Sequence, residues 1–116
     1  MNYNPTHKVY EQALRSPGRL ALFADDTELD YAGLLAQVCS LAATLADAGG
    51  APGSRVGILG SRSLLSIRAM LAATWCGATY VPLSVRWPAE RLASALQRTD
   101  LDALVVDEHG HDRLSA

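Results

Sequence analysis

The sequence predicts an α/β fold, in which an N-terminal helix and a small β-hairpin precede half of a doubly wound parallel sheet. Short apolar runs at Arg55–Leu59, Thr79–Leu83 and Ala103–Val106 alternate with segments of helical periodicity, which gives the order strand, helix, strand, helix, strand. Turn signals such as Pro52-Gly53 separate the segments. The composition, 49% hydrophobic and 19% charged, is typical of a folded α/β domain and not of a disordered tail.

Residues 1–54 are expected to form a helix, a hairpin and a second helix. Thr6 is positioned to cap the first helix, which stops at Ser16-Pro17-Gly18. Its apolar positions recur at three-to-four spacing: Val9, Tyr10, Ala13 and Leu14. Leu20–Phe23 is typical of a strand, and Asp25-Asp26 predicts a tight turn into a second short strand that runs through Leu29.

The second helix is expected to begin after Asp30 as its cap and to end at Gly49-Gly50. One face of it carries a regular apolar stripe: Leu34, Val38, Leu41, Ala42 and Leu45. Such a stripe indicates a helix that packs one side against a core.

Residues 55–106 are expected to form the βαβαβ unit. Ser61 or Ser63 caps a helix that runs to about Cys76 and is closed by Gly77. This helix is apolar nearly all round, as a helix that covers a parallel sheet would be: Leu64, Leu65, Ile67, Met70, Leu71 and Trp75. Pro88 is expected at the first position of the next helix. That helix has Glu90 in its first turn, Arg98 near its last and a buried stripe of Leu92, Ala95 and Leu96.

Residues 107–116 are expected to be a polar tail, so residues 1–116 form one domain whose three-stranded sheet has open edges. The apolar helix before Cys76 then needs cover that this chain does not supply. We therefore expect an incomplete lobe that self-associates, is marginally stable, or binds a complementary fragment.

Composition also bears on partners and location. A net charge of -2 gives no reason to expect binding to nucleic acid or to an anionic membrane. The N-terminus lacks a basic region followed by an apolar run, and the apolar stretches are shorter than a membrane span needs. These features favour a cytoplasmic protein.

Three segments resemble the adenylate-forming ligases, the superfamily of nonribosomal peptide synthetase adenylation domains, acyl-CoA synthetases and luciferases. Leu29–Leu34 resembles the family's LTYxEL segment, and Ala51–Val56 its xPGDRV turn and strand. Trp75–Leu83 with Pro88–Leu92 resembles LKAGxAYVPLDxxxPxER. The three occur in the family's order and spacing and cover nearly the whole chain, and the wording of the last favours amino-acid adenylation domains. Gly33 departs from the family, which has Glu there, so the reciprocal capping box is lost.

The resemblance implies the N-terminal part of the large lobe of an enzyme that uses ATP and Mg²⁺ to form an acyl-AMP. Such an enzyme holds the reacting phosphate in a Ser/Thr/Gly-rich loop that ends in a lysine. These residues contain no such loop, and the single lysine is Lys8, in the N-terminal helix. We therefore assign no catalytic, cofactor-binding or metal residue and expect the chain to be inactive alone.

Other candidate sites have simpler explanations. Gly60–Ser63 follows a strand and opens a helix, where anions can bind, but a turn with a capping serine accounts for it. Asp107–Asp112 carries metal-type ligands in an expected flexible tail. Two further groups are interpreted as packing residues: the cysteines Cys39 and Cys76, and the aromatic residues Trp75, Trp87 and Tyr80.

Three hypotheses for function remain open at this point. The chain is the N-terminal fragment of an adenylating ligase, one subunit of a naturally split enzyme, or a non-catalytic interaction module that kept the fold. The partners implied are the remainder of the enzyme and a phosphopantetheine carrier protein. The acyl substrate is not encoded in these residues.

Overall fold

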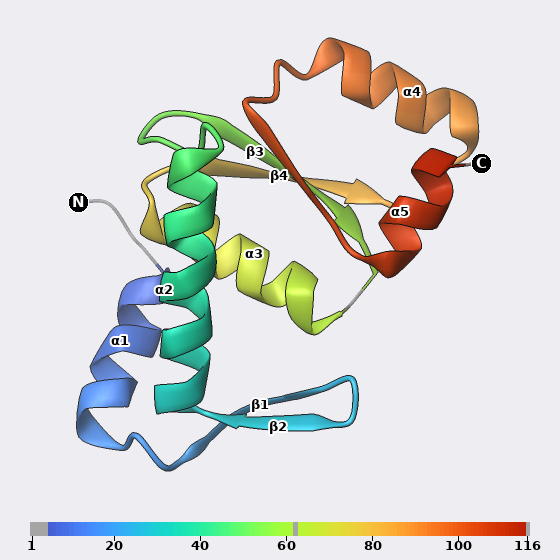
Figure 1. The fold of residues 1–116 in the computed structure, drawn as a ribbon. Helices are drawn as coiled ribbons and strands as arrows, with labels where there is room; N and C mark the ends of the chain where they lie inside the picture. Colours follow the sequence, from blue (N-terminus) through green and yellow to red (C-terminus); the bar gives the residue numbers. More distant parts are fainter. Residues whose placement is uncertain (1–4, 62, 116) are drawn as a thin grey trace.

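The computed structural model describes residues 5–61 and 63–115 and confirms the predicted α/β fold (Figure 1). The N-terminal elements are helix α1 (Pro5–Arg15), the hairpin strands β1 (Leu20–Ala24) and β2 (Thr27–Asp30), and helix α2 (Tyr31–Asp47). The parallel unit follows as β3 (Arg55–Gly60), α3 (Leu64–Trp75), β4 (Thr79–Ser84), α4 (Ala89–Arg98), β5 (Ala103–Val106) and α5 (Glu108–Ser115).

The parallel sheet has the strand order β4-β3-β5, so the first strand of the unit lies between the other two. Arg55 pairs with Thr79 on one side, and Val56 with Ala103 on the other. Helix α3 covers one face and α4 the other (Figure 1). Each face has its own apolar core: Val56 belongs to the core shared with α2 and α3, whereas Leu59 packs with Leu83 and Leu92.

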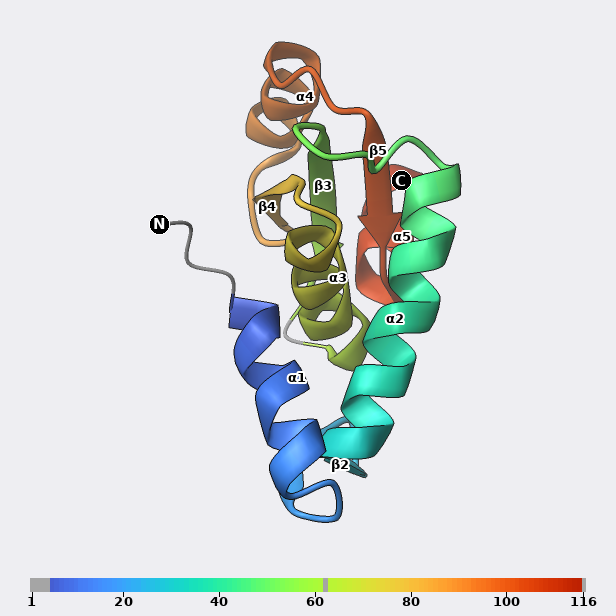
Figure 2. The same ribbon diagram turned by 90° about the vertical axis from the view of Figure 1, so that its left-hand side faces the viewer.

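Helices α1 and α2 cover the side of α3 that faces away from the sheet (Figure 2). The stripe of α2 is buried there: Leu34, Val38, Ala42 and Leu45. Leu71, Ala72 and Ala73 of α3 belong to the same core. The expectation that α3 lacks a second cover within this chain is therefore wrong, because the N-terminal elements provide it.

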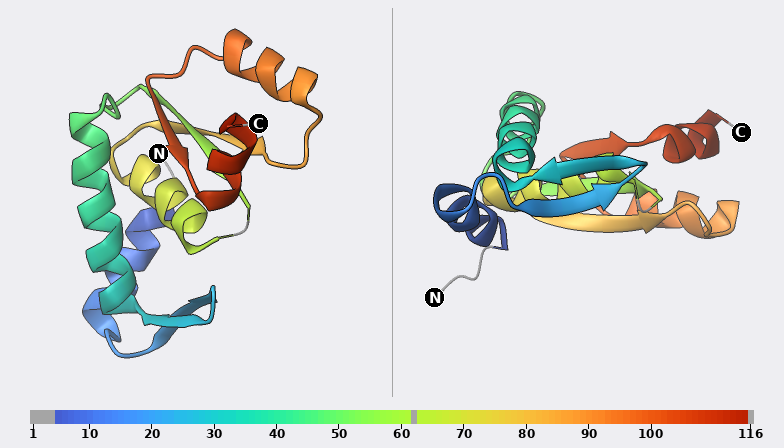
Figure 3. Two further views of the ribbon diagram at one scale, coloured as in Figure 1. Left: turned by 45° about the vertical axis from the view of Figure 1, so that its right-hand side comes forward. Right: turned by 90° about the horizontal axis from the view of Figure 1, so that it is seen from below.

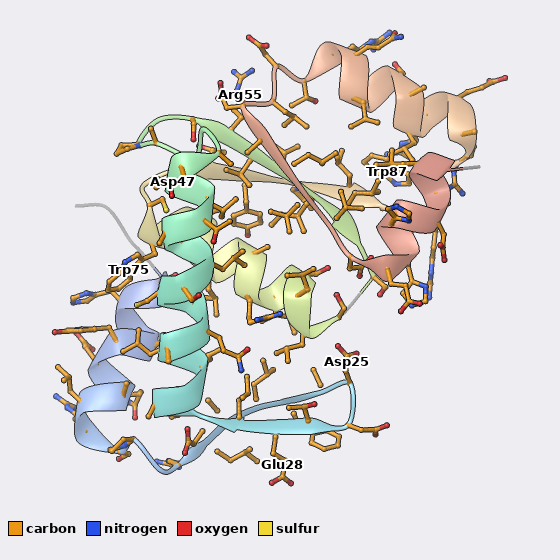
Figure 4. All side chains as sticks on the ribbon, viewed as in Figure 1. Asp25, Glu28, Asp47, Arg55, Trp75 and Trp87 are labelled. Atoms are coloured by element: carbon orange, nitrogen blue, oxygen red, sulfur yellow. The ribbon has the colours of Figure 1, made fainter. Side chains whose placement is uncertain are left out.

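The hairpin of β1 and β2 reaches under the sheet and contacts the start of α3 at its tip (Figure 3). Asp25 and Asp26 have φ values of 53° and 58°, as a tight hairpin turn that matches the twist of the strands requires. The Asp25 carboxylate, which Figure 4 labels at the tip, accepts a hydrogen bond from the Leu64 N–H at 2.8 Å. A residue of the turn thus satisfies one free donor of the α3 N-terminus.

Two helix starts differ from the predictions. Thr6 lies inside the first turn of α1 and does not cap it. Its hydroxyl donates to the Leu71 carbonyl at 2.6 Å and lies 2.6 Å from the Thr74 hydroxyl. Pro88 lies in the capping position before α4, one residue earlier than expected. Asp30 and Ser63 do cap α2 and α3, accepting from the N–H groups three residues later.

Thr6→Val is expected to lower the free energy of unfolding by about 1–2 kcal/mol, because it removes a fully buried hydroxyl that ties α1 to α3 while it keeps the side-chain shape. Urea unfolding measures the change. Thr44→Val is the matched control, since Thr44 is exposed and bonds only within α2. Equal effects of the two substitutions would show that the Thr6 contact adds nothing.

Candidate functional site

The strand order places a topological switch point between the carboxyl ends of β3 and β5. In open α/β sheets with this order, ligands bind in the crevice outside these ends, where the chain connections run to opposite sides. Here the crevice lies beside Gly60, the last residue of β3, and Ser61, which follows it. On the other side is Asp107, which follows β5. These residues form the candidate site.

Asp107 fills this crevice with its own carboxylate. One oxygen, Oδ2, accepts hydrogen bonds from the Ser61 N–H (2.9 Å), the Ser61 hydroxyl (3.2 Å) and the Ser63 hydroxyl (2.7 Å). The other, Oδ1, accepts from the Gly110 N–H at 2.8 Å. Asp107 is only 7% exposed. The structure therefore places an internal anion where this type of sheet usually holds a ligand.

The pKa of Asp107 reflects two opposing effects. Burial raises it, but the hydrogen bonds from Gly110, Ser63 and Ser61 stabilise the carboxylate and hold the pKa below its ordinary value of 3.8. The carboxylate is therefore ionised at neutral pH.

The donors near the start of α3 are used within the chain. Leu64 donates to Asp25, Ser66 donates to the Ser63 hydroxyl at 3.1 Å, and Ser61 and Ser63 donate to Asp107. Arg62, within the Gly60–Ser63 turn, lies outside the described residues. The structure agrees with the simpler interpretation, a turn with a capping serine.

Because the folded-state pKa of Asp107 is lowered, its contribution to stability is complete above the unfolded pKa and disappears as pH falls through the folded value. Stability is therefore expected to fall below about pH 4 more steeply in the wild type than in Asp107→Asn. Chemical unfolding at pH 3 and at pH 7 tests this. Identical pH dependence of the two proteins would contradict it.

The segment after β5 is a helix, α5, so the expected polar tail is wrong. Asp107 caps this helix by accepting from the residue three positions later. Gly110 allows close packing, since a Cβ at this position would collide with the Leu59 carbonyl. An Asp directly after a strand, followed by Glu108 in the first turn, was the available sequence signal for this cap.

The described residues do not fit a Mg²⁺ site. They contain no group of three or more His, Cys, Asp and Glu side chains that could hold a metal ion. This includes the segment Asp107–Asp112. The Asp107 oxygens already accept four hydrogen bonds. We therefore derive no chemistry through a metal for these residues.

Two cavities open next to the carboxyl end of β4. The larger, about 740 Å³, lies over the loop that follows β4 and is lined by Gly60, Ser61, Pro82, Leu83, Ser84, Val85, Arg86 and Trp87. The smaller, about 330 Å³, lies between α3 and β4 and is mostly apolar; its lining includes Ile58, Ile67, Met70, Tyr80 and Pro82. Among the described residues, neither lining includes a lysine or a carboxylate.

Of the five predicted packing residues, Cys76 and Trp87 are half-buried and the other three are exposed. Cys39 is exposed on α2, so that prediction is wrong; it lies one position past the buried Val38. Cys76 is half-buried, and burial raises the pKa of its thiol, which donates to the Ala42 carbonyl at 3.4 Å. Tyr80 is 38% exposed.

The two tryptophans lie at opposite ends of the molecule (Figure 4). Trp75 is 39% exposed and contacts the Tyr10 ring of α1, with centroids 5.9 Å apart. Trp87 is half-buried under Arg91, whose guanidinium carbon lies 4.4 Å from the centroid of the Trp87 ring. The backbone carbonyl of Trp87 accepts a hydrogen bond from the Arg113 side chain of α5 at 2.9 Å. Trp87 thus joins α4 and α5.

Comparison with known proteins gives one consistent result. The family profile described as "AMP-binding enzyme" matches residues 9–116. Malpibaldin synthetase of Mortierella alpina is 39% identical over 113 residues, which is 95% of this chain and 2% of that protein. AMB antimetabolite synthetase AmbB of Pseudomonas aeruginosa is 37% identical over 111 residues, 95% of this chain and 9% of that protein. The chain thus spans only a small part of these relatives.

Solved structures show the same fold. A putative long-chain-fatty-acid CoA ligase from Rhodopseudomonas palustris superposes with a TM-score of 0.89 at 24% identity, over 98% of this chain and 29% of that one. The Klebsiella oxytoca NpsA N-terminal subdomain, in complex with 3-hydroxybenzoyl-AMSN, has a TM-score of 0.81 at 28% identity, over 92% and 27%. The three-stranded unit and hairpin therefore match part of a larger lobe in each.

Proposed function

Because the chain belongs to the family of AMP-binding enzymes, we propose that it is the N-terminal part of an ATP-dependent adenylating ligase that is inactive without the remainder of the enzyme. The complete enzyme activates an amino acid or another carboxylic acid as an acyl-AMP. It then transfers the acyl group to a thiol, on a phosphopantetheine carrier protein or on CoA.

The observation that carries this proposal is the match over residues 9–116 to one family. Two proteins named nonribosomal peptide synthetase, ecdA of Aspergillus rugulosus and gloA of Glarea lozoyensis, are each similar over 92% of the chain. An amino acid is therefore the favoured class of substrate.

The chemistry explains why these residues are not sufficient. Formation of an acyl-AMP places charge on the α-phosphate, which preorganised donors and cations must stabilise. The one lysine, Lys8, lies on α1, which packs on α2 and α3, away from the carboxyl ends of the strands (Figure 1). At those ends Asp107 adds negative charge beside the donors that a phosphate would need.

The purified chain is expected to show no amino-acid-dependent exchange of pyrophosphate into ATP. A chimaera, in which residues 9–116 replace the matching segment of an adenylation domain from a related synthetase, is expected to retain exchange activity. The reason is that the chain supplies the fold of the lobe, while the rest of the chimaera supplies the phosphate loop.

The control is the same adenylation domain with its N-terminal segment deleted, which is expected to be inactive. Exchange by the purified chain alone, persisting through a second purification, would contradict the proposal. A folded chimaera with no exchange activity would favour a non-catalytic module.

A further inference from the structure

The outward side of helix α1 exposes apolar side chains to solvent. The inward side is used within the fold: the Thr6 hydroxyl bonds to α3, and Val9 packs against the core that α2 and α3 share. Tyr10 and Leu14 lie one helical turn apart and are 38% and 68% exposed. They form a ridge on the outer side of the helix.

Trp75, the last residue of α3, extends this ridge from a second element. Its ring contacts the Tyr10 ring and is 39% exposed, and Figure 4 shows it beside α1. His7 also stacks on Tyr10, with centroids 6.2 Å apart, and its Nε2 lies 3.3 Å from the Glu11 carboxylate. Neighbouring rings thus hold Tyr10 in place, as suits an anchor residue of an interface. We call the surface of Tyr10, Leu14 and Trp75 the α1 face.

Exposed apolar residues are concentrated in this part of the molecule. Eight large apolar side chains of the described residues are exposed, and four of them lie between residues 5 and 24. A fifth is Trp75, which contacts Tyr10. Single exposed apolar residues are normal in a soluble protein, whereas a group of them usually marks an interaction surface.

The surroundings of the α1 face are basic, although the chain as a whole has a net charge of -2. Residues 5–24 contain three of the ten Lys and Arg residues but only one of the twelve Asp and Glu residues, Glu11. The three cations are exposed: Lys8 and Arg15 lie on α1, and Arg19 lies in the turn that follows. A partner with apolar and negatively charged groups fits this combination.

Two kinds of partner have such groups, an anionic membrane and an acidic amphipathic helix. A helix that lies in a membrane surface buries its whole apolar side in lipid, but the side of α1 that contains Val9 is already packed on the core. Segments that bind anionic lipids also carry clusters of about four to eight cations, more than the three present here. A partner helix needs only a ridge and a few charges beside it, so it is favoured.

We propose that the α1 face binds an acidic amphipathic helix of a neighbouring domain or protein. The apolar side of that helix packs on the α1 face, and its Asp and Glu side chains lie near the three cations. The interaction is separate from adenylation chemistry. Trp75 lies just before the start of β4, so the α1 face is remote from the carboxyl ends of the strands, where the candidate site lies.

The two tryptophans allow a direct test, because Trp75 belongs to the α1 face and Trp87 lies at the opposite end of the molecule (Figure 4). The probe is a synthetic amphipathic helix with leucines on one side and glutamates beside them, which is titrated into the isotope-labelled chain. The indole N–H resonance of Trp75 is expected to shift, and that of Trp87 is expected to stay. Raising NaCl from about 50 to about 500 mM is expected to weaken binding about tenfold or more.

Variants separate the charged part of the surface from the apolar part. Lys8→Glu/Arg15→Glu is expected to weaken peptide binding about tenfold or more, because two attractive charges become repulsive. Arg98→Glu, at the exposed end of α4, is the matched control and is expected to bind like the wild type. Leu14→Ala removes apolar area on the outer side of α1 and is expected to weaken binding about fivefold.

Three results would overturn the inference. One is peptide binding that leaves the Trp75 resonance unchanged or that Lys8→Glu/Arg15→Glu does not weaken. Another is a Trp75 shift that depends on the concentration of the chain alone, which would make a second copy the occupant. The third is binding to vesicles of phosphatidylserine and phosphatidylcholine under conditions in which the peptide does not bind.

The chimaera described above keeps this inference distinct from the proposed function. Lys8→Glu/Arg15→Glu is expected to weaken peptide binding by the chimaera, measured by fluorescence anisotropy of the labelled peptide, and to leave pyrophosphate exchange unchanged. An active chimaera that does not bind the peptide overturns the inference and leaves the proposed function intact. A chimaera that binds the peptide but lacks exchange activity counts against the proposed function and supports the inference.

Discussion

Replacing Asp107 with alanine is expected to lower the free energy of unfolding by about 2–4 kcal/mol. The substitution removes the acceptor of four hydrogen bonds and leaves the Ser61 N–H and the buried Gly110 N–H without their partner. Since Asp107 joins the end of β5 to the turn after β3 and to the start of α5, the loss should extend to all three. Urea unfolding at neutral pH measures the global change.

Asp112→Ala is the matched control, because Asp112 is an exposed acid on the same helix. It is expected to change stability by no more than about 0.5 kcal/mol. If both substitutions have equally small effects, the carboxylate does not organise the switch point.

Gly110→Ala is expected to destabilise the protein by about 2–4 kcal/mol, although alanine favours a helix over glycine by about 1 kcal/mol. A Cβ at this position would collide with the Leu59 carbonyl and lie 2.9 Å from Val106 Cγ1. The first contact is with backbone, so rotation of a side chain cannot relieve it. Helix α5 must therefore move away from the sheet.

Two measurements check this result. Urea unfolding gives the overall loss, and hydrogen exchange is expected to show the amides of α5 as the first to lose protection. Gly18→Ala is the control, since a Cβ there meets nothing within 4 Å. A Gly110→Ala protein as stable as the Gly18→Ala protein would contradict the close packing of α5 on β3.

Local signals in the sequence predicted most of the fold. The apolar runs predicted β3, β4 and β5, and Asp30 and the Asp25-Asp26 turn predicted the start of α2 and the hairpin. These signals are short-range: periodicity, caps and turn residues act within a few positions of the chain. The family followed from three such segments in register.

Other properties depend on contacts between residues far apart in the sequence. Thr6 is a residue type that often caps helices, yet its hydroxyl donates a hydrogen bond to the Leu71 carbonyl, 65 residues away. The polar segment after Val106 lacks a helical apolar stripe, but packing of Gly110 on β3 makes it a helix. Cys39 lies inside an apolar pattern, but only the position of α3 decides which face of α2 is buried.

The candidate site shows the same division. The sequence by itself determined the family, the order of the elements and the absence of a phosphate loop from these residues, because each depends on residue types and their spacing. Only the tertiary structure showed that Asp107 occupies the switch point. Which donors meet a carboxylate 46 residues away is decided when the strands align in the sheet.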